Sequence, residues 1–197
     1  QRDARGVHTL TLADATHFNA LGEAMLGALQ AAMNTVAQDE QARAVVITAQ
    51  GKAFCPGHNL KEMLARPELA YYQALFAKCS KLMLSIAKLP VPVLAKVQGV
   101  ATAAGCQLVA QCDLAVASTE ARFGVNGIDV GLFCSTPSVP LSRNINAKHA
   151  MEMLVTGEFL SAQEAAQKGL INHAVVPAQL DSEVERLLQS ILSKPRE

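Results

Sequence analysis

Two glycine-containing loops hold the residues of this sequence that are best placed to do chemistry. The first spans residues 51–63 (GKAFCPGHNLKEM) and the second spans residues 97–118 (VQGVATAAGCQLVAQCDLAVAS), and each lies between a strand-like and a helix-like segment. Ala103, Ala104 and Gly105 in the second loop are small enough for a ligand to approach the backbone. Backbone N–H groups at the start of a helix can stabilise negative charge on a ligand oxygen. A run of small residues also suits close helix packing, so this loop alone leaves both roles open.

Four segments in order along the chain together resemble the crotonase family, also called the enoyl-CoA hydratase/isomerase family. They are the two loops, HFNAL at residues 17–21, and MLVTGEFLSAQEAAQKGLINHAVV at residues 153–176. The resemblance implies an α/β fold of the ClpP-like crotonase type, a spiral of ββα units. It also implies lyase or isomerase chemistry of fatty acid metabolism on a coenzyme A thioester, no tightly bound cofactor, and a homotrimer or dimer of trimers.

The resemblance implies that two backbone N–H groups form an oxyanion hole for the thioester carbonyl. In the family, one donor follows the glycine of the first loop and the other is a small residue of the second, which places them at His58 and Ala104. Preorganised donors favour a negatively charged enolate over the neutral thioester, and losing one typically costs about 3 kcal/mol. Asn19 suits a helix N-cap. The implied coenzyme A site is lined chiefly by backbone and apolar contacts of Phe18, Ala20, Gly57, Asn59 and Leu60.

The sequence departs from the family at the two glutamates that a hydratase of this family uses to activate water and to protonate the α-carbon. The first position is Gln107 and the second is Gly127. A glutamine amide can orient water but cannot exchange a proton near neutral pH, and glycine has no side chain. Because each acid or base group contributes typically about 10²- to 10⁴-fold, the loss of both predicts that classical hydration is all but abolished.

Three other carboxylates are candidates to replace the two glutamates. If its segment is extended, Asp129 faces the same side as Gly127 and reaches the pocket. Asp113, at the start of a strand, is interpreted as a structural hydrogen-bonding residue. Glu62 is interpreted as part of a solvated helix face.

Cys134 lies within GLFCSTP, residues 131–137, where the family's chain passes the acyl pocket. A thiol nucleophile activated by His58 would make the chain a thioesterase, whereas a buried cysteine is more commonly a small hydrophobic residue. The remaining histidines show no spacing suited to metal binding, so no metal site is expected; they are His8, His17, His149 and His173.

Alternating strands and helices must position these loops. Apolar runs and alternation predict strands at residues 6–12, 44–48, 93–97, 114–117 and 173–176, and composition and spacing predict helices at residues 21–37, 71–88 and 103–110. Residues 49–59 are expected to form a loop. Ser161 with Glu164 indicates a capping box, and Gly169 a helix stop. The alternation predicts parallel strands joined by helical crossovers.

A final helix places one apolar stripe that must dock either on the preceding core or on a neighbouring subunit, and the sequence alone does not decide which. The stripe is Leu180, Val184, Leu187, Leu188, Ile191 and Leu192. We expect residues 1–197 to form a single domain, with the family's C-terminal helical trimerisation segment largely absent after residue 197.

Composition limits the partners. The 197 residues carry 17 basic and 17 acidic side chains with a formal net charge of zero, so no field attracts nucleic acid or an anionic membrane. The most apolar stretch, residues 91–110, is too interrupted to span a membrane. Five cysteines without a CxxC pair disfavour a disulfide framework and suggest a reducing compartment, the cytoplasm if the protein is bacterial or alternatively the mitochondrial matrix.

These observations favour an acyl-CoA-processing enzyme that relies on the oxyanion hole and on water held by Gln107. The alternative is a non-catalytic acyl-CoA-binding protein that kept the hole and lost the proton-transfer groups. An acyl-CoA thioesterase ranks third. A nucleotide-binding α/β domain is disfavoured because no GxGxxG or GxxxxGK[ST] string follows a strand.

Overall fold

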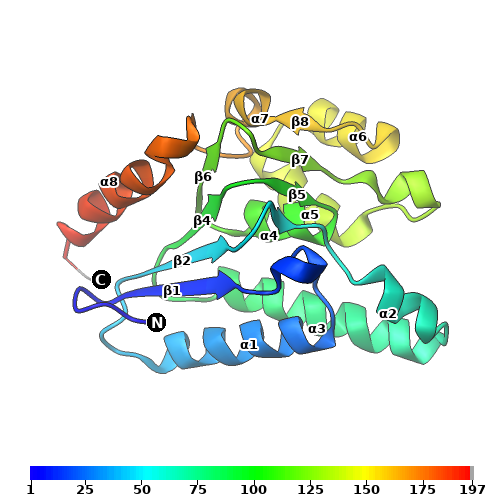
Figure 1. Ribbon diagram of the computed structural model, residues 1–197, viewed down its shortest axis with the longest axis horizontal. Coiled ribbons are helices and arrows are strands. Elements are labelled where there is room, and N and C mark those ends of the chain that lie inside the picture. The colour runs from blue at the N-terminus through cyan, green and yellow to red at the C-terminus, as the bar shows by residue number, and fades with distance from the viewer. Residues whose placement is uncertain (196–197) are drawn as a thin grey trace.

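A computed structural model describes residues 1–195, and a five-stranded, fully parallel sheet forms its centre (Figure 1). Its middle strands are buried on both faces, as strands covered by helices on both sides must be. All five strands predicted from the sequence are confirmed. In order across the sheet they are β1 (Val7–Leu12), β2 (Ala44–Ala49), β4 (Val93–Val97), β6 (Leu114–Ser118) and β9 (His173–Val175).

A second sheet has four short strands, of which the first three are parallel and the last is antiparallel to its neighbour. These are β3 (Ala53–Cys55), β5 (Val100–Thr102), β7 (Arg122–Gly124) and β8 (Leu160–Ser161). Strand β3 lies inside residues 49–59, so the prediction of a loop throughout that segment was wrong. A strand of three residues is too short to show a periodicity.

The chain winds as repeated ββα units, which confirms the fold class. Each unit places one strand in the larger sheet and the next in the smaller sheet before entering a helix: β2-β3-α2-α3, β4-β5-α4 and β6-β7-α5. The helices are α1 (Glu23–Gln38), α2 (Leu60–Ala65), α3 (Leu69–Ala87), α4 (Ala104–Gln111), α5 (Ser135–Asn144), α6 (Ala147–Thr156), α7 (Ala162–Lys168) and α8 (Leu180–Leu192), with short 3₁₀ turns η1 (Ala15–His17), η2 (Asn126–Val130) and η3 (Pro177–Gln179).

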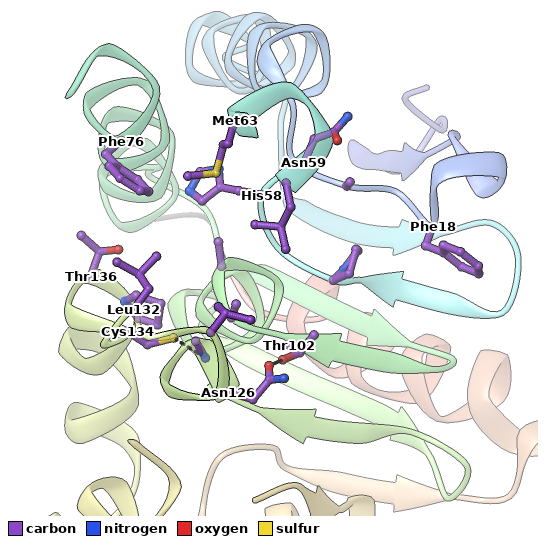
Figure 2. A pocket seen from close by; sticks show the side chains of 18 of the residues that line it. Phe18, His58, Asn59, Met63, Phe76, Thr102, Asn126, Leu132, Cys134 and Thr136 are labelled. Atoms are coloured by element: carbon purple, nitrogen blue, oxygen red, sulfur yellow. Dashed lines mark hydrogen bonds between the residues drawn. The ribbon is translucent and has the colours of Figure 1, made fainter. Parts of the chain in front are cut away.

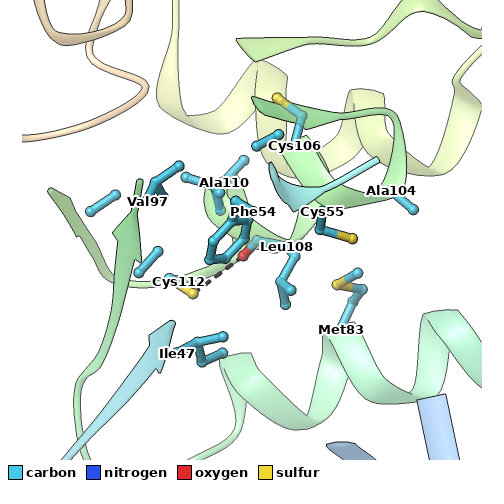
Figure 3. Packing of buried hydrophobic residues seen from close by; sticks show 14 of the residues in the cluster. Ile47, Phe54, Cys55, Met83, Val97, Ala104, Cys106, Leu108, Ala110 and Cys112 are labelled. Atoms are coloured by element: carbon cyan, nitrogen blue, oxygen red, sulfur yellow. Dashed lines mark hydrogen bonds between the residues drawn. The ribbon is translucent and has the colours of Figure 1, made fainter. Parts of the chain in front are cut away.

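The main core lies between the larger sheet and helices α1, α3 and α4. Every residue of α4 from Ala104 to Ala110 is buried, as predicted for this helix. Cys55 and Cys106 pack there among apolar side chains (Figure 3), and burial raises the pKa of each thiol to about 12. Both are therefore neutral thiols that fill space at physiological pH.

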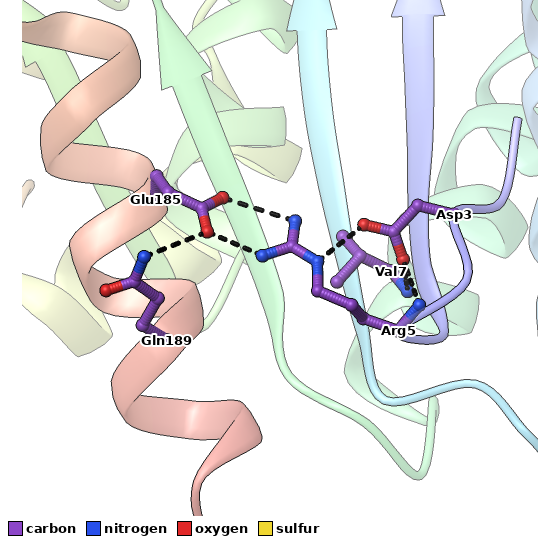
Figure 4. A network of polar contacts seen from close by, with 5 residues as sticks. All are labelled: Asp3, Arg5, Val7, Glu185 and Gln189. Atoms are coloured by element: carbon purple, nitrogen blue, oxygen red, sulfur yellow. Dashed lines mark hydrogen bonds and ion pairs between the residues drawn. The ribbon is translucent and has the colours of Figure 1, made fainter.

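Helix α8 covers the opposite face of the larger sheet. Leu180, Val184 and Leu188 pack against residues of β1, β2, β4 and β6, so the last apolar stripe docks on the core of its own chain. Polar contacts also hold α8 in place. The Arg5 guanidinium donates a hydrogen bond to Asp3 beside β1 and another to Glu185 on α8 (Figure 4).

The ends of α7 follow the sequence prediction. Ser161 and Glu164 form the capping box, and Gly169 ends the helix with a left-handed φ of 88°. Across residues 1–195, no helix combines the length and apolar character needed to cross a membrane.

Candidate functional site

One cavity of about 580 Å³ lies where the three parallel strands of the smaller sheet end. Because β3, β5 and β7 are parallel neighbours, the segments that follow them meet at one edge of the sheet, where ligands commonly bind in α/β folds. These segments bring Ala104 and Gly127 to the cavity wall, together with His58, which Figure 2 shows. Phe18, Ala20, Asn59 and Leu60 also line it, whereas Gly57, Gln107 and Asp129 are not among its lining residues.

The two loops predicted to form the oxyanion hole touch at Gly57. This glycine has a φ of 91°, and a Cβ added to it would lie 3.0 Å from the Ala104 nitrogen and 3.0 Å from the Ala103 Cβ. Among the hydrogen bonds within residues 1–195, none uses the backbone N–H of His58 or of Ala104. Two free donors therefore belong to residues that line one cavity and lie on loops in contact.

Helix α4 begins under backbone strain at the same place. Ala103 is its N-cap with φ 50° and ψ −122°, a conformation that L side chains rarely adopt and that costs about 1–3 kcal/mol. A Cβ on Gly105 would lie 2.0 Å from the Cys55 carbonyl oxygen, so only glycine lets α4 start against β3. Such strain persists only where surrounding contacts enforce it and is typical of functional sites.

The imidazole of His58 is held in one orientation. Its Nδ1 lies 3.2 Å from the carbonyl oxygen of Leu21, and its ring meets Phe76 edge to face with centroids 5.1 Å apart. Burial lowers the pKa of His58 below its ordinary value, and the Leu21 carbonyl only partly offsets this. The ring is therefore neutral at pH 7.

Gln107 lies one turn into α4 and is 5% exposed, and its Oε1 has no hydrogen-bond partner among the described residues. Gly127 lies in η2, where its N–H donates to Cys134 Sγ at 3.3 Å and its carbonyl accepts from the Leu132 N–H at 2.9 Å. The loop after η2 is folded onto Gly127 and fills the space that a side chain would need.

Asp129 does not approach the cavity, and the expectation of an extended segment was wrong. Residues 126–130 form the 3₁₀ turn η2, so Asp129 and Gly127 do not share a face. The exposed Asp129 accepts a hydrogen bond from Asn126 Nδ2 at 3.4 Å, and its Oδ1 lies 2.8 Å from where a Cβ on Gly157 would be.

Cys134 lines the cavity but lacks an activating base. Burial raises the pKa of its thiol, and the bond from the Gly127 N–H only partly offsets this. His58 bonds to Leu21 instead, and no hydrogen bond within residues 1–195 joins His58 to Cys134. The arrangement required for a thiol nucleophile is not formed.

Polar residues near the cavity hold its walls in place. Asn19 is buried, accepts from the Asp14 N–H and donates to the carbonyls of Gln50 and Ala53, so it ties the HFNAL segment to β3. The predicted helix cap by Asn19 was wrong, because the N-cap of α1 is Gly22.

Three more side chains near these loops have structural roles. Asn59 caps α2 by accepting from the N–H groups of Lys61 and Glu62. Glu62 accepts from the Glu23 N–H at the start of α1, so the interpretation of a purely solvated residue was wrong. Asp113 accepts from the Val93 N–H at 2.8 Å, which confirms its structural role.

The cavity wall formed by α2, α3 and α5 could not be predicted from the sequence. Met63 and Phe76 come from α2 and α3, and Leu132, Phe133 and Thr136 come from the segment before and within α5. In the sequence, Phe76 cannot be distinguished from any core position of an apolar helix. Among the residues the structure describes, no three His, Cys, Asp or Glu side chains gather as metal ligands would.

Comparison with known proteins places the chain in a family. The family model described as "Enoyl-CoA hydratase/isomerase" matches residues 2–197. Enoyl-CoA hydratase domain-containing protein 3, mitochondrial, of Rattus norvegicus is 44% identical over 99% of this chain and 65% of its own length. The chain thus spans slightly less than two thirds of the length of this curated relative.

Solved structures of similar sequence point to the same family. A crystal structure of an enoyl-CoA hydratase from Mycobacterium smegmatis is 61% identical with a TM-score of 0.98, covering 100% of this chain and 76% of that one. The crystal structure of human enoyl-CoA hydratase domain-containing protein 3 is 44% identical with a TM-score of 0.93, covering 99% and 77%. Matches of this extent in sequence and in fold lead to one conclusion: the chain belongs to the enoyl-CoA hydratase/isomerase family.

Proposed function

We propose that this protein binds the thioester carbonyl of an acyl-CoA between the backbone N–H groups of His58 and Ala104 and stabilises the enolate derived from it. The observation that carries the proposal is the pair of free N–H groups on two loops that touch at Gly57 and border one cavity. Charge that develops on the carbonyl oxygen would meet donors already in place, so their stabilisation would be greater for the enolate than for the thioester.

The proposed enzyme does not carry out classical hydration at an appreciable rate. Gln107 and Gly127 occupy the positions that the family resemblance gives to two glutamates, and the space beside Gly127 is filled by Leu132 and Cys134. The same loss supports the alternative of a non-catalytic acyl-CoA-binding protein. The unactivated thiol of Cys134 disfavours the thioesterase.

Titration with coenzyme A, acetyl-CoA and crotonyl-CoA by calorimetry, followed by assays of hydration, isomerisation and thioester hydrolysis, tests this proposal. We expect crotonyl-CoA to bind and to show no ordinary hydration. Absence of acyl-CoA binding would contradict the proposed site, and rapid hydration would show that the argument from the missing glutamates is wrong. Binding without any turnover would favour the non-catalytic alternative.

A matched pair of glycine variants tests the contact between the loops. Gly57→Ala puts a Cβ 3.0 Å from the Ala104 nitrogen, whereas Gly169→Ala introduces similar strain at φ 88°, with its nearest neighbour at 3.1 Å, at the end of α7 away from the cavity. We expect Gly57→Ala to weaken crotonyl-CoA binding by about tenfold or more, equivalent to about 1.4 kcal/mol, and Gly169→Ala to leave the Kd unchanged. Equal effects would mean that the result reflects strain alone.

The compartment and the oligomeric state of this protein are proposed from its relatives. The rat protein is named as mitochondrial, which supports the mitochondrial matrix over the cytoplasm as the compartment of this protein. From the family we also propose that the small-molecule partner is an acyl-CoA. We propose likewise that the whole protein assembles as a trimer or a dimer of trimers.

A further inference from the structure

None of the residues within 1–195 that line the cavity carries a carboxylate. Its lining residues with titratable side chains are His17, His58, Lys61 and Cys134. His17 is exposed and paired with Asp14 at 2.9 Å, and Lys61 is exposed. Cys134 is a neutral thiol because burial raises its pKa. Among the described residues that border the cavity, the half-buried His58 is therefore the one neutral base that is neither exposed nor paired with a carboxylate.

Hydrogen bonding fixes the tautomer of His58. The carbonyl oxygen of Leu21 can only accept, so the Nδ1 that lies 3.2 Å from it carries the proton. The lone pair is therefore on Nε2, which has no hydrogen-bond partner within residues 1–195 and is not among the buried unpartnered atoms. Phe76 packs edge to face on the ring and limits its rotation. The result is an oriented base with one free nitrogen.

The position of this nitrogen relative to a ligand follows from the backbone. His58 would contribute both its own N–H to the thioester oxygen and its side chain to the acyl part of the cavity, between Met63 and Phe76 (Figure 2). A base on the same residue as an oxyanion donor lies within one side-chain length of the N–H group that holds the carbonyl oxygen. Proximity of this kind is a main source of catalytic rate.

We propose, building on the function proposed above, that His58 Nε2 is the catalytic base that moves a proton at the α-carbon of the bound acyl-CoA. Nε2 takes the α-proton, the C–H electron pair forms the carbon–carbon double bond of the enolate, and the carbonyl π pair moves to the oxygen held by the two N–H groups. The imidazolium exchanges its Nε2 proton with solvent, so reprotonation at the α-carbon incorporates a solvent proton, and reprotonation at the γ-carbon of a 3-enoyl-CoA gives the 2-enoyl-CoA. Nothing is oxidised or reduced.

Deuterium incorporation at the α-carbon of hexanoyl-CoA in D₂O, followed by mass spectrometry, tests this role. His58→Asn keeps the backbone N–H and a side-chain donor toward Leu21 and removes Nε2. We expect its exchange rate to fall by about 100-fold or more while the Kd for hexanoyl-CoA changes little. His173→Asn, on β9 and outside the cavity lining, is the matched control and should exchange as the unaltered protein does.

The outcomes separate this inference from the function on which it rests. If the unaltered protein binds hexanoyl-CoA but exchanges no α-proton, or if His58→Asn exchanges normally, the inference is overturned and the binding site stands. If hexanoyl-CoA does not bind, both fail.

Should His58→Asn not fold, the pH profile of the unaltered protein decides. A base whose pKa lies below the ordinary imidazole value of 6.5 gives a rate that is constant above that pH and falls in acid. A rate that climbs steadily from pH 7 to pH 9 would overturn the proposal.

Discussion

A side chain at residue 127 would meet two atoms of the loop that follows it. A Cβ there would lie 2.3 Å from the Leu132 carbonyl oxygen and 2.8 Å from Cys134 Sγ. The carboxylate that the family resemblance implies at this position would therefore have no room, because the loop occupies the space beside Gly127. Replacing the glycine alone cannot recreate the environment of a working acid.

Introducing glutamates at the two positions that the resemblance implies should consequently fail to produce a hydratase. We expect Gln107→Glu combined with Gly127→Glu to hydrate crotonyl-CoA no faster than Gln107→Glu alone, and to melt at a lower temperature because the loop must shift. Absorbance of the enoyl thioester and a thermal melt measure the two effects. Full hydratase activity in the double variant would contradict this view of the loop.

Strain at Ala103 predicts a stabilising substitution. Glycine tolerates φ 50° and ψ −122°, so Ala103→Gly should relieve part of the cost of about 1–3 kcal/mol, less the added entropy of the unfolded chain. We expect the melting temperature to rise by about 2–4 °C for each kcal/mol gained in a chain of this size. A lower melting temperature would show that the methyl group contributes more by packing than it costs in strain.

At the scale of elements, the sequence predicts the larger sheet and its helices well and the smaller sheet poorly. Strands of five or six residues, such as β2 and β4, show β-branched or alternating patterns, whereas β3, β5 and β7 have three residues each. The site forms at the ends of these short strands. That the loops of His58 and Ala104 border one site could be predicted from their motifs, whereas the place of Phe76 beside His58 could not, because it depends on tertiary packing.

The docking of α8 should depend on apolar burial more than on its ion pair. Leu188 is 4% exposed against the larger sheet, so Leu188→Ala should lower the free energy of unfolding by about 2–5 kcal/mol. The side chains of Arg5 and Glu185 are 45% and 39% exposed, so water screens their ion pair. Arg5→Ala should therefore lower the free energy of unfolding by less than about 1 kcal/mol. Urea unfolding of the two variants measures both values, and an equal loss would contradict this division.

At the scale of the whole molecule, helices α5 and α6 expose three large apolar side chains. Val139, Met151 and Val155 are 47%, 55% and 53% exposed. The family resemblance predicts a trimer or dimer of trimers, and light scattering should then give three or six times the chain mass of 20.9 kDa. Met151→Lys should reduce that mass if this face takes part, whereas Leu84→Lys, on α3 and 57% exposed, serves as the control. A mass of a single chain at micromolar concentration would contradict the prediction.

The most direct test of the proposed function is the infrared carbonyl band of hexanoyl-CoA labelled with ¹³C at the thioester carbon. Two N–H donors, from His58 and Ala104, polarise the carbonyl and weaken its double bond, so we predict a band at lower frequency in the bound state than in water. Gly57→Ala should move the band back toward its free position. A bound thioester whose carbonyl frequency equals or exceeds that of the free ligand would contradict the oxyanion hole.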